Sequence, residues 1–133
     1  NTWIVKTLNQ LKENKPFILS DIYKDDDDKK YVVELFRKVV LNHTEYQKEI
    51  VDKTPNWDAE RIADLDMILI KMAICEFLKF PSIPTRVTIN EYIEISKDYS
   101  TKKSSFFING VLDKILKDMS KTKRLNKIGR GLL

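Results

Sequence analysis

Glycine and proline are rare in this sequence, and most of them stand where stretches of helical periodicity end. The 133-residue chain has three glycines, at 110, 129 and 131, and four prolines, at 16, 55, 81 and 84. These two residues interrupt helices more strongly than any others, so the long stretches without them favour continuous helices. The sequence therefore predicts an all-α protein, a compact bundle of about six or seven helices.

Apolar residues recur every three or four positions through most of the chain, which is the period of an amphipathic helix. At the start of the chain we expect a short amphipathic segment at 2–13 and an apolar cluster at 17–22. Two helices that meet near Asn42 and end before Thr54 should follow, and then a helix capped by Asn56 or Asp58 that runs to about Phe80. The last two helices should start between Thr85 and Thr88 and at Ser100 and Thr101. The helix that ends near Phe80 is apolar on nearly every side from Met67 to Leu78. Such a helix is typically enclosed by others.

Three regions follow from this pattern. Residues 30–119 form the helical domain, residues 1–29 precede it, and residues 120–133 form a basic tail. The chain has a net charge of +4, yet residues 117–133 alone contain six Lys or Arg against one Asp. A tail of this kind is usually solvated and disordered, and it also supplies the sequence-independent attraction expected of a nucleic-acid binder.

The acidic run Asp25–Asp28 resembles part of an engineered epitope tag. We favour a natural segment, because the run leads directly into a helix whose N-terminal dipole favours nearby carboxylates. A calcium loop is the other alternative, but the alternating ligands and the central glycine of such a loop are absent from the sequence.

Residue types suited to catalysis are scarce. His43 is the single histidine, and Cys75, the single cysteine, lies in an apolar stretch where a buried thiol is expected. A Cys/His dyad, a zinc site of the usual composition and a serine triad therefore lack support. We expect no enzyme activity, no metal and no cofactor. The longest apolar stretch is broken by Lys71 and Glu76, which argues against a membrane span, and a single cysteine fits a reducing cytoplasm.

The remaining carboxylates have structural interpretations. Thr88 and Glu91 have the spacing of a capping box at a helix start. We expect Asp64, Asp66 and Glu76 to pair with Arg61 or Lys71.

Two adjacent lysines, Lys102 and Lys103, fall in the expected first turn of the last helix. Positive charge there opposes the helix dipole by roughly 0.3 to 1 kcal/mol per residue, so stability does not explain these lysines. Together with free backbone N–H groups and the hydroxyls of Ser104 and Ser105, their ammonium groups would make a phosphate site. A pair of solvated lysines without a function is the alternative.

Phe106 should lie on the solvent side of that last helix. Its buried face should consist of regularly spaced apolar residues, which are Ile108, Val111, Leu112, Ile115 and Met119. Phe106 lies about 160° from the centre of that face, and Phe107 lies on its flank. An exposed Phe beside two lysines is suited to stacking a base and holding its phosphate in single-stranded RNA. It is equally suited to anchoring a partner protein, and it would be buried if another segment covered that side.

The residue order of the second half of the chain carries a family resemblance. The matching segments are Arg61–Ala63, Ala73–Glu76, Ile83–Pro84, Val87, Ile89–Glu91, Glu94, Lys97 and Phe107–Lys114. In this order they resemble the signature of the NusB family of bacterial transcription antitermination factors. Residues 30–57 resemble the preceding helical hairpin of that family more weakly, and residues 1–29 are not accounted for.

The resemblance implies an all-helical RNA-binding protein that needs no cofactor. Members of the family pair with NusE, a small-subunit ribosomal protein, on boxA RNA, and they help RNA polymerase to read through terminators, notably in ribosomal RNA operons. By position, Lys102, Lys103, Phe106 and Phe107 match an RNA-facing region, and Asp66 matches a position near the partner interface.

One departure from the family concerns the start of the chain. The family commonly opens with an arginine-rich helix that contacts RNA, whereas residues 1–30 contain no arginine. Either an upstream segment is missing from this chain, or RNA binding relies on the basic turn and the tail. The rival interpretations are a helical protein-interaction module without useful RNA affinity and the NusB-like domain of an RNA-modifying enzyme.

Overall fold

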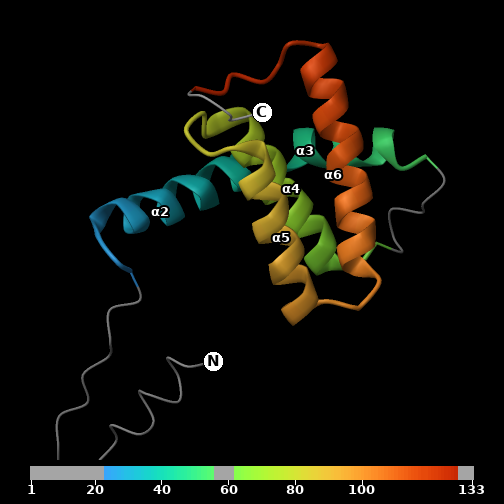
Figure 1. Cartoon of the computed structure of the whole chain (residues 1–133), viewed down its shortest axis with the longest axis horizontal. Coiled ribbons are helices and arrows are strands. Elements are labelled where there is room, and N and C mark those ends of the chain that lie inside the picture. Colours follow the sequence, from blue (N-terminus) through green and yellow to red (C-terminus); the bar gives the residue numbers. More distant parts are fainter. Residues whose placement is uncertain (1–22, 56–61, 129–133) are drawn as a thin grey trace, which may run out of the picture. The chain divides into compact units, whose positions relative to one another are not determined.

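The structure, a computed structural model, describes residues 23–55 and 62–128. In chain order their helices are α2 (Asp26–Leu41), α3 (His43–Lys53), α4 (Asp64–Lys79), α5 (Thr85–Tyr99) and α6 (Ser104–Lys121) (Figure 1). The described residues contain no strand, and the all-α class is confirmed. The expected count of six or seven helices is not matched by these five. The two N-terminal stretches at 2–13 and 17–22, which contributed to that count, lie outside the described residues.

The described residues belong to two compact units that divide between Val33 and Glu34. In the second unit α4 is the central helix, since it packs against α3, α5 and α6 (Figure 1). Its buried side chains surround the helix axis and include Leu69, Ile70, Ala73, Ile74, Cys75 and Phe77. The prediction that this helix is enclosed by others is confirmed.

The start of α4 differs from the expectation. The helix begins at Asp64, after the extended residue Ala63, whose side chain makes no capping hydrogen bond. Asp64 and Asp66 lie in the first turn, where the helix dipole favours carboxylates. The buried side chain of Ile62 leads the chain into the helix. A cap of α4 at Asn56 or Asp58 is therefore wrong, and those two residues lie outside the described part of the chain.

A buried carboxylate joins α4 to α5. Glu76 is only 4% exposed. Its Oε2 accepts a hydrogen bond of 2.8 Å from Thr88 Oγ1, and its Oε1 accepts one of 2.7 Å from the hydroxyl of Tyr92. Hydrogen bonds of this kind offset the cost of burying the carboxylate. The expected pairing of Glu76 with Lys71 is wrong, because the Lys71 ammonium donates to Gln47.

The same contact explains why the predicted capping box is absent. Pro84 precedes α5 in an extended conformation, so the helix begins at Thr85 and Thr88 lies inside it. The fixed φ of proline suits this position at a helix start. The hydroxyl of Thr88 is then free to reach Glu76, and the capping role assigned to Thr88 and Glu91 is wrong.

The chain reverses direction after α6 through a Schellman motif. The N–H of Arg124 donates to the carbonyl of Met119, and the N–H of Lys123 donates to that of Ser120. Lys123 adopts a left-handed φ of 55°. The reversal brings Arg124 to α3, where its guanidinium donates two hydrogen bonds, of 2.7 and 3.1 Å, to the carboxylate of Glu49. These bonds raise the pKa of Arg124.

The tail then closes the C-terminal end of α4. The Lys127 ammonium donates to the carbonyl oxygens of Glu76 and Phe80, each at 2.9 Å, and the N–H of Ile128 donates to the carbonyl of Pro81. The last carbonyls of a helix lack partners within it, so Lys127 acts as a C-cap. Burial lowers the pKa of Lys127, and the nearby Glu76 carboxylate opposes this effect. Arg124, Lys127 and Ile128 therefore bind the tail to the bundle, although Arg124 and Ile128 themselves stay exposed.

Cys75 lies in the centre of the bundle and is fully buried, as the sequence predicts. Burial raises the pKa of the Cys75 thiol, and it also raises the pKa of the neighbouring Tyr46 hydroxyl. Both groups are therefore protonated at neutral pH.

Candidate nucleic-acid interface

The turn between α5 and α6 carries the two lysines singled out in the sequence. α5 ends at Tyr99 and α6 begins at Ser104, so Lys102 lies in the turn and Lys103 is the N-cap residue of α6. The expected helix start at Ser100 and Thr101 is therefore wrong. Both lysine side chains are exposed, and neither has a hydrogen-bond or ion-pair partner among the described residues.

A network of short hydrogen bonds fixes this turn to α4. The Ser100 hydroxyl donates to Asp66 Oδ1 at 2.6 Å and lies 2.8 Å from the Ser104 hydroxyl. The Ser104 oxygen also accepts from the N–H of Thr101 at 3.3 Å and lies 2.9 Å from the Thr101 hydroxyl. Asp66 and Ser104 are both buried. The basic turn is therefore held in one conformation by side chains beneath it.

This network changes the roles of two residues. Ser104 was expected to offer its hydroxyl to RNA, but the hydroxyl is engaged within the turn. The Asp66 carboxylate accepts a hydrogen bond from Ser100, so its expected pairing with Lys71 is wrong, while its place near a partner interface stays a prediction. The sequence signal for the network is the density of Ser and Thr between residues 100 and 105. We expected Ser104 and Ser105 to donate to a ligand, and Ser100 and Thr101 to begin the helix.

Phe106 is 81% exposed, which confirms the prediction from helical periodicity. The predicted buried face of α6 is also confirmed, since each of its apolar residues is buried, namely Ile108, Val111, Leu112, Ile115 and Met119. Phe107 is half-buried on the flank of that face. Phe106 is therefore not a core residue, and the interpretation that another segment covers it is wrong for the described part of the chain.

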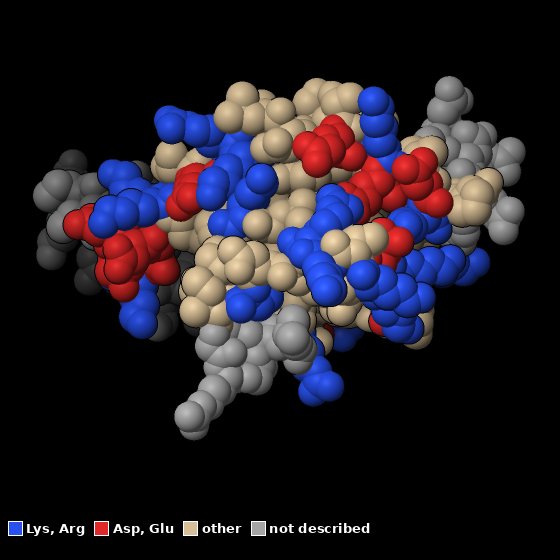
Figure 2. All heavy atoms as spheres, turned by 90° about the horizontal axis from the view of Figure 1, so that it is seen from above, with Lys and Arg blue, Asp and Glu red and all other residues tan. Residues whose placement is uncertain are grey.

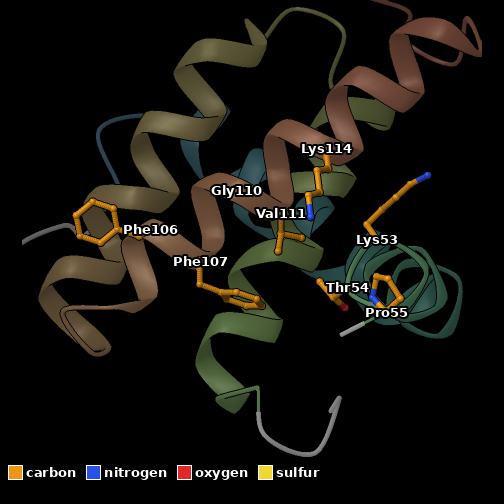
Figure 3. A pocket seen from close by; sticks show the side chains of 8 residues that line it. All are labelled: Lys53, Thr54, Pro55, Phe106, Phe107, Gly110, Val111 and Lys114. Carbon is orange, nitrogen blue, oxygen red and sulfur yellow. The ribbon is translucent and has the colours of Figure 1, made fainter. Parts of the chain in front are cut away.

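A groove with a volume of about 270 Å³ lies between the C-terminal end of α3 and the first half of α6 (Figure 3). Lys53, Thr54 and Pro55 form its α3 side. Its α6 side is formed by Phe106, Phe107, Gly110, Val111 and Lys114. In Figure 3 the ring of Phe107 is directed toward the α3 side, whereas the ring of Phe106 points away from it.

The two lysines of this groove differ in whether a carboxylate neutralises their charge. The Lys53 ammonium lies 2.9 Å from Asp118 Oδ1, so much of its charge is neutralised. Lys114 forms no hydrogen bond or ion pair with the residues that the structure describes. The neighbouring lysine, Lys117, is paired with Asp113. Lys114 is therefore the available cation of the groove.

Sequence reasoning missed this groove. Phe106, Gly110 and Lys114 follow one another at intervals of four, which places them along one side of a helix. That spacing could have identified the α6 side, but nothing in the sequence indicates that the end of α3 lies opposite. The α3 side is a long-range contact that only the fold reveals.

Elsewhere on the surface, basic and acidic side chains are intermixed. On the face shown in Figure 2, Lys and Arg alternate with Asp and Glu and leave apolar and neutral surface between them. No group of three or more His, Cys, Asp or Glu among the described residues could hold a metal ion. None of the described helices combines the length and apolar character that a membrane span needs.

Comparison with known proteins gives a consistent result. The sequence profile of the NusB family matches residues 3–117, which includes most of the N-terminal region that the resemblance left unaccounted for. A protein of Salinibacter ruber described as transcription antitermination protein NusB is 44% identical over 111 residues, which are 83% of this chain and 69% of that protein.

Two further relatives bear the same description. The protein of Chloroherpeton thalassium is 37% identical over 92% of this chain and 58% of its own length. The protein of Finegoldia magna is 42% identical over 64% of this chain and 65% of its own length. The chain therefore spans about three-fifths to two-thirds of the length of these relatives. A solved structure of NusB from T. maritima superimposes with a TM-score of 0.70 at 30% identity, covering 80% of this chain and 75% of that one.

Proposed function

Because the chain belongs to the NusB family, we propose that it is a transcription antitermination factor that binds RNA jointly with a protein partner. Following the family resemblance, the RNA is single-stranded and boxA-like, and the partner is NusE, the small-subunit ribosomal protein. The complex acts with RNA polymerase, notably in ribosomal RNA transcription. The proposed activity is binding in the bacterial cytoplasm, without catalysis and without a cofactor.

The observation that carries the RNA-binding part of this proposal is the basic turn beside an exposed aromatic ring. Lys102 and Lys103 project from a turn that a buried network holds in place, and Phe106 is exposed one helical turn further on. Two exposed ammonium groups supply attraction to phosphates, and an exposed ring supplies a surface for base stacking. Preorganisation reduces the entropy lost when a ligand binds.

The proposal gives each residue of the predicted site a role. Lys102 and Lys103 neutralise phosphates, and Phe106 and Phe107 contact bases. Ser104 and Asp66 position the turn from beneath it, since both are buried. Asp66 thereby affects the partner interface through Ser100 and the turn and not by direct contact.

The proposal is tested by measuring the affinity of the chain for a boxA-like single-stranded RNA over a range of salt concentrations. Replacing Lys102 and Lys103 together by glutamine should weaken binding to all single-stranded sequences and reduce the slope of log affinity against log salt by about 1.4. The matched control replaces Lys48 and Lys79, two exposed lysines of α3 and α4, by glutamine. The control should retain the affinity of the parent chain.

A protein-interaction role is the second candidate, and the exposure of both Tyr99 and Phe106 favours it. Binding to immobilised NusE, measured without RNA, separates the two roles. If the lysine variant binds RNA like the parent chain and loses NusE, the turn is a protein interface and the RNA-binding assignment fails.

A further inference from the structure

Gly110 occupies a position in α6 where packing does not require a glycine. It lies in the interior of the helix, where glycine is less stable than alanine. A Cβ atom at this position would meet no neighbouring atom of the described residues within 4 Å. The backbone there is helical, so the left-handed conformations open to glycine are not used. The packing of the residues that the structure describes therefore gives no reason for the missing side chain.

The open space at Gly110 is part of the groove between α3 and α6. Lys114 lies one turn further along α6, and Pro55 lies on the opposite side (Figure 3). The groove volume of about 270 Å³ lies just below the roughly 300–1,000 Å³ of pockets that enclose drug-sized ligands. A groove of this size suits a single ring system better than a complete cofactor.

We propose that Gly110 is a specificity-determining position that leaves room for one unpaired nucleobase between α6 and the end of α3. Lys114 neutralises the adjoining phosphate. This inference rests on the proposed RNA-binding function. It extends that function, because it places one base of the bound RNA in the groove between α3 and α6.

Charge and continuity favour RNA as the occupant. Lys114 is the groove lysine that has no ion-pair partner among the described residues. An anionic backbone passing it would also pass the exposed lysines at the start of the same helix. Three residues separate Phe106 from Gly110, so the two share one side of α6. A strand that stacks on Phe106 can therefore reach the groove within a few nucleotides.

The experiment fills the groove without changing its charge. Gly110→Leu projects a side chain into the open space, and Gly110→Ala adds only a methyl group. Ser120→Leu, at an exposed position near the end of α6, controls for the added apolar surface. Thermal melting should show that all three variants fold, with Gly110→Ala melting at the parent temperature or above it.

Two probes separate bases from phosphates. One is an oligouridine of about a dozen nucleotides, and the other is a fully abasic strand of the same length. The parent chain should prefer the oligouridine, and Gly110→Leu should lose roughly five- to 150-fold of that affinity, the range of one stacked base. Its affinity for the abasic strand should equal that of the parent chain, because the lysines are unchanged. Ser120→Leu should behave as the parent chain with both probes.

The outcomes distinguish this inference from the proposed function. If the parent chain binds oligouridine and Gly110→Leu binds it equally well, the groove holds no base and the inference is overturned alone. If the parent chain binds neither strand, the proposed function and the inference both fail. If Gly110→Leu loses NusE while keeping oligouridine, the groove belongs to the protein partner, and the inference is again overturned.

Discussion

Two hydroxyl groups, both on α5, make the burial of the Glu76 carboxylate possible. Thr88 and Tyr92 reach it from positions 12 and 16 residues further along the chain. The sequence identifies Glu76 as a charge within an apolar stretch, but its partners depend on how α5 packs against α4. By contrast, the exposure of Phe106 follows from periodicity within one helix, so it could be predicted. Residue-level prediction succeeds here for local geometry and fails for long-range polar contacts.

Thr88→Val tests the contribution of the buried contact to stability. Valine has nearly the same shape as threonine but cannot donate a hydrogen bond, so Glu76 Oε2 loses its 2.8 Å partner. We expect the free energy of unfolding to fall by about 1 to 3 kcal/mol. Denaturant unfolding measures this change, and Thr44→Val, at an exposed position in α3, is the matched control. An unchanged stability would mean that the contact contributes little.

Phe106→Ala tests the proposed stacking surface. The ring is exposed, so its removal should leave the melting temperature unchanged. We expect a loss of about 1 to 3 kcal/mol in affinity for single-stranded RNA with no change in the salt slope, because stacking does not release counterions. Titrations at several salt concentrations measure both quantities. A reduced salt slope with unchanged base dependence would count against stacking.

At the scale of elements, the sequence places the helices in the right order but misplaces several of their ends. The start of α4 lies at Asp64 and that of α6 at Ser104, each later than expected. Polar residues that resemble caps at Thr88 and Ser100 instead bond to side chains of α4. The hydroxyl of a Ser or Thr can serve a cap or a tertiary contact equally well, and only the packing decides between them.

Lys123→Gly should stabilise the end of α6. Lys123 holds a left-handed conformation that costs most residues about 1 to 2 kcal/mol, and glycine adopts it without that cost. Glycine also increases the entropy of the unfolded chain, so we expect a net gain of about 0.5 to 1 kcal/mol in the free energy of unfolding. Lys121→Gly, within the last turn of α6, should instead destabilise the protein by about 1 kcal/mol. Thermal melting of both variants gives the comparison.

At the scale of the whole molecule, the bundle around α4 was predictable because its core is apolar and periodic. The long apolar stretch of α4 and the regular stripe of α6 both specify buried surfaces. The course of the tail was not predictable, since its composition is that of a solvated segment. Arg124 and Lys127 bind Glu49 and the end of α4 because the Schellman motif turns the chain toward them.

Ile108→Asp should unfold the bundle as one unit. Ile108 is fully buried in α6, which contacts α3, α4 and α5. An unpaired carboxylate at this position costs several kcal/mol, which is comparable to the total stability of a domain of this size. Circular dichroism should show loss of cooperative melting at ordinary temperature. The adjacent exposed variant Asn109→Asp should melt like the parent chain, and cooperative melting of Ile108→Asp would contradict the placement of α6.

The buried thiol of Cys75 can report how often the core of the bundle becomes exposed to solvent. It is the only thiol in the chain, it is fully enclosed by the bundle, and its raised pKa keeps it in the unreactive protonated form. A thiol reagent can therefore modify it only while the core is transiently exposed. The modification rate in the parent chain measures how often the centre of the molecule opens. Adding RNA or the protein partner to the same assay would show whether a ligand bound at the surface slows the opening of the centre.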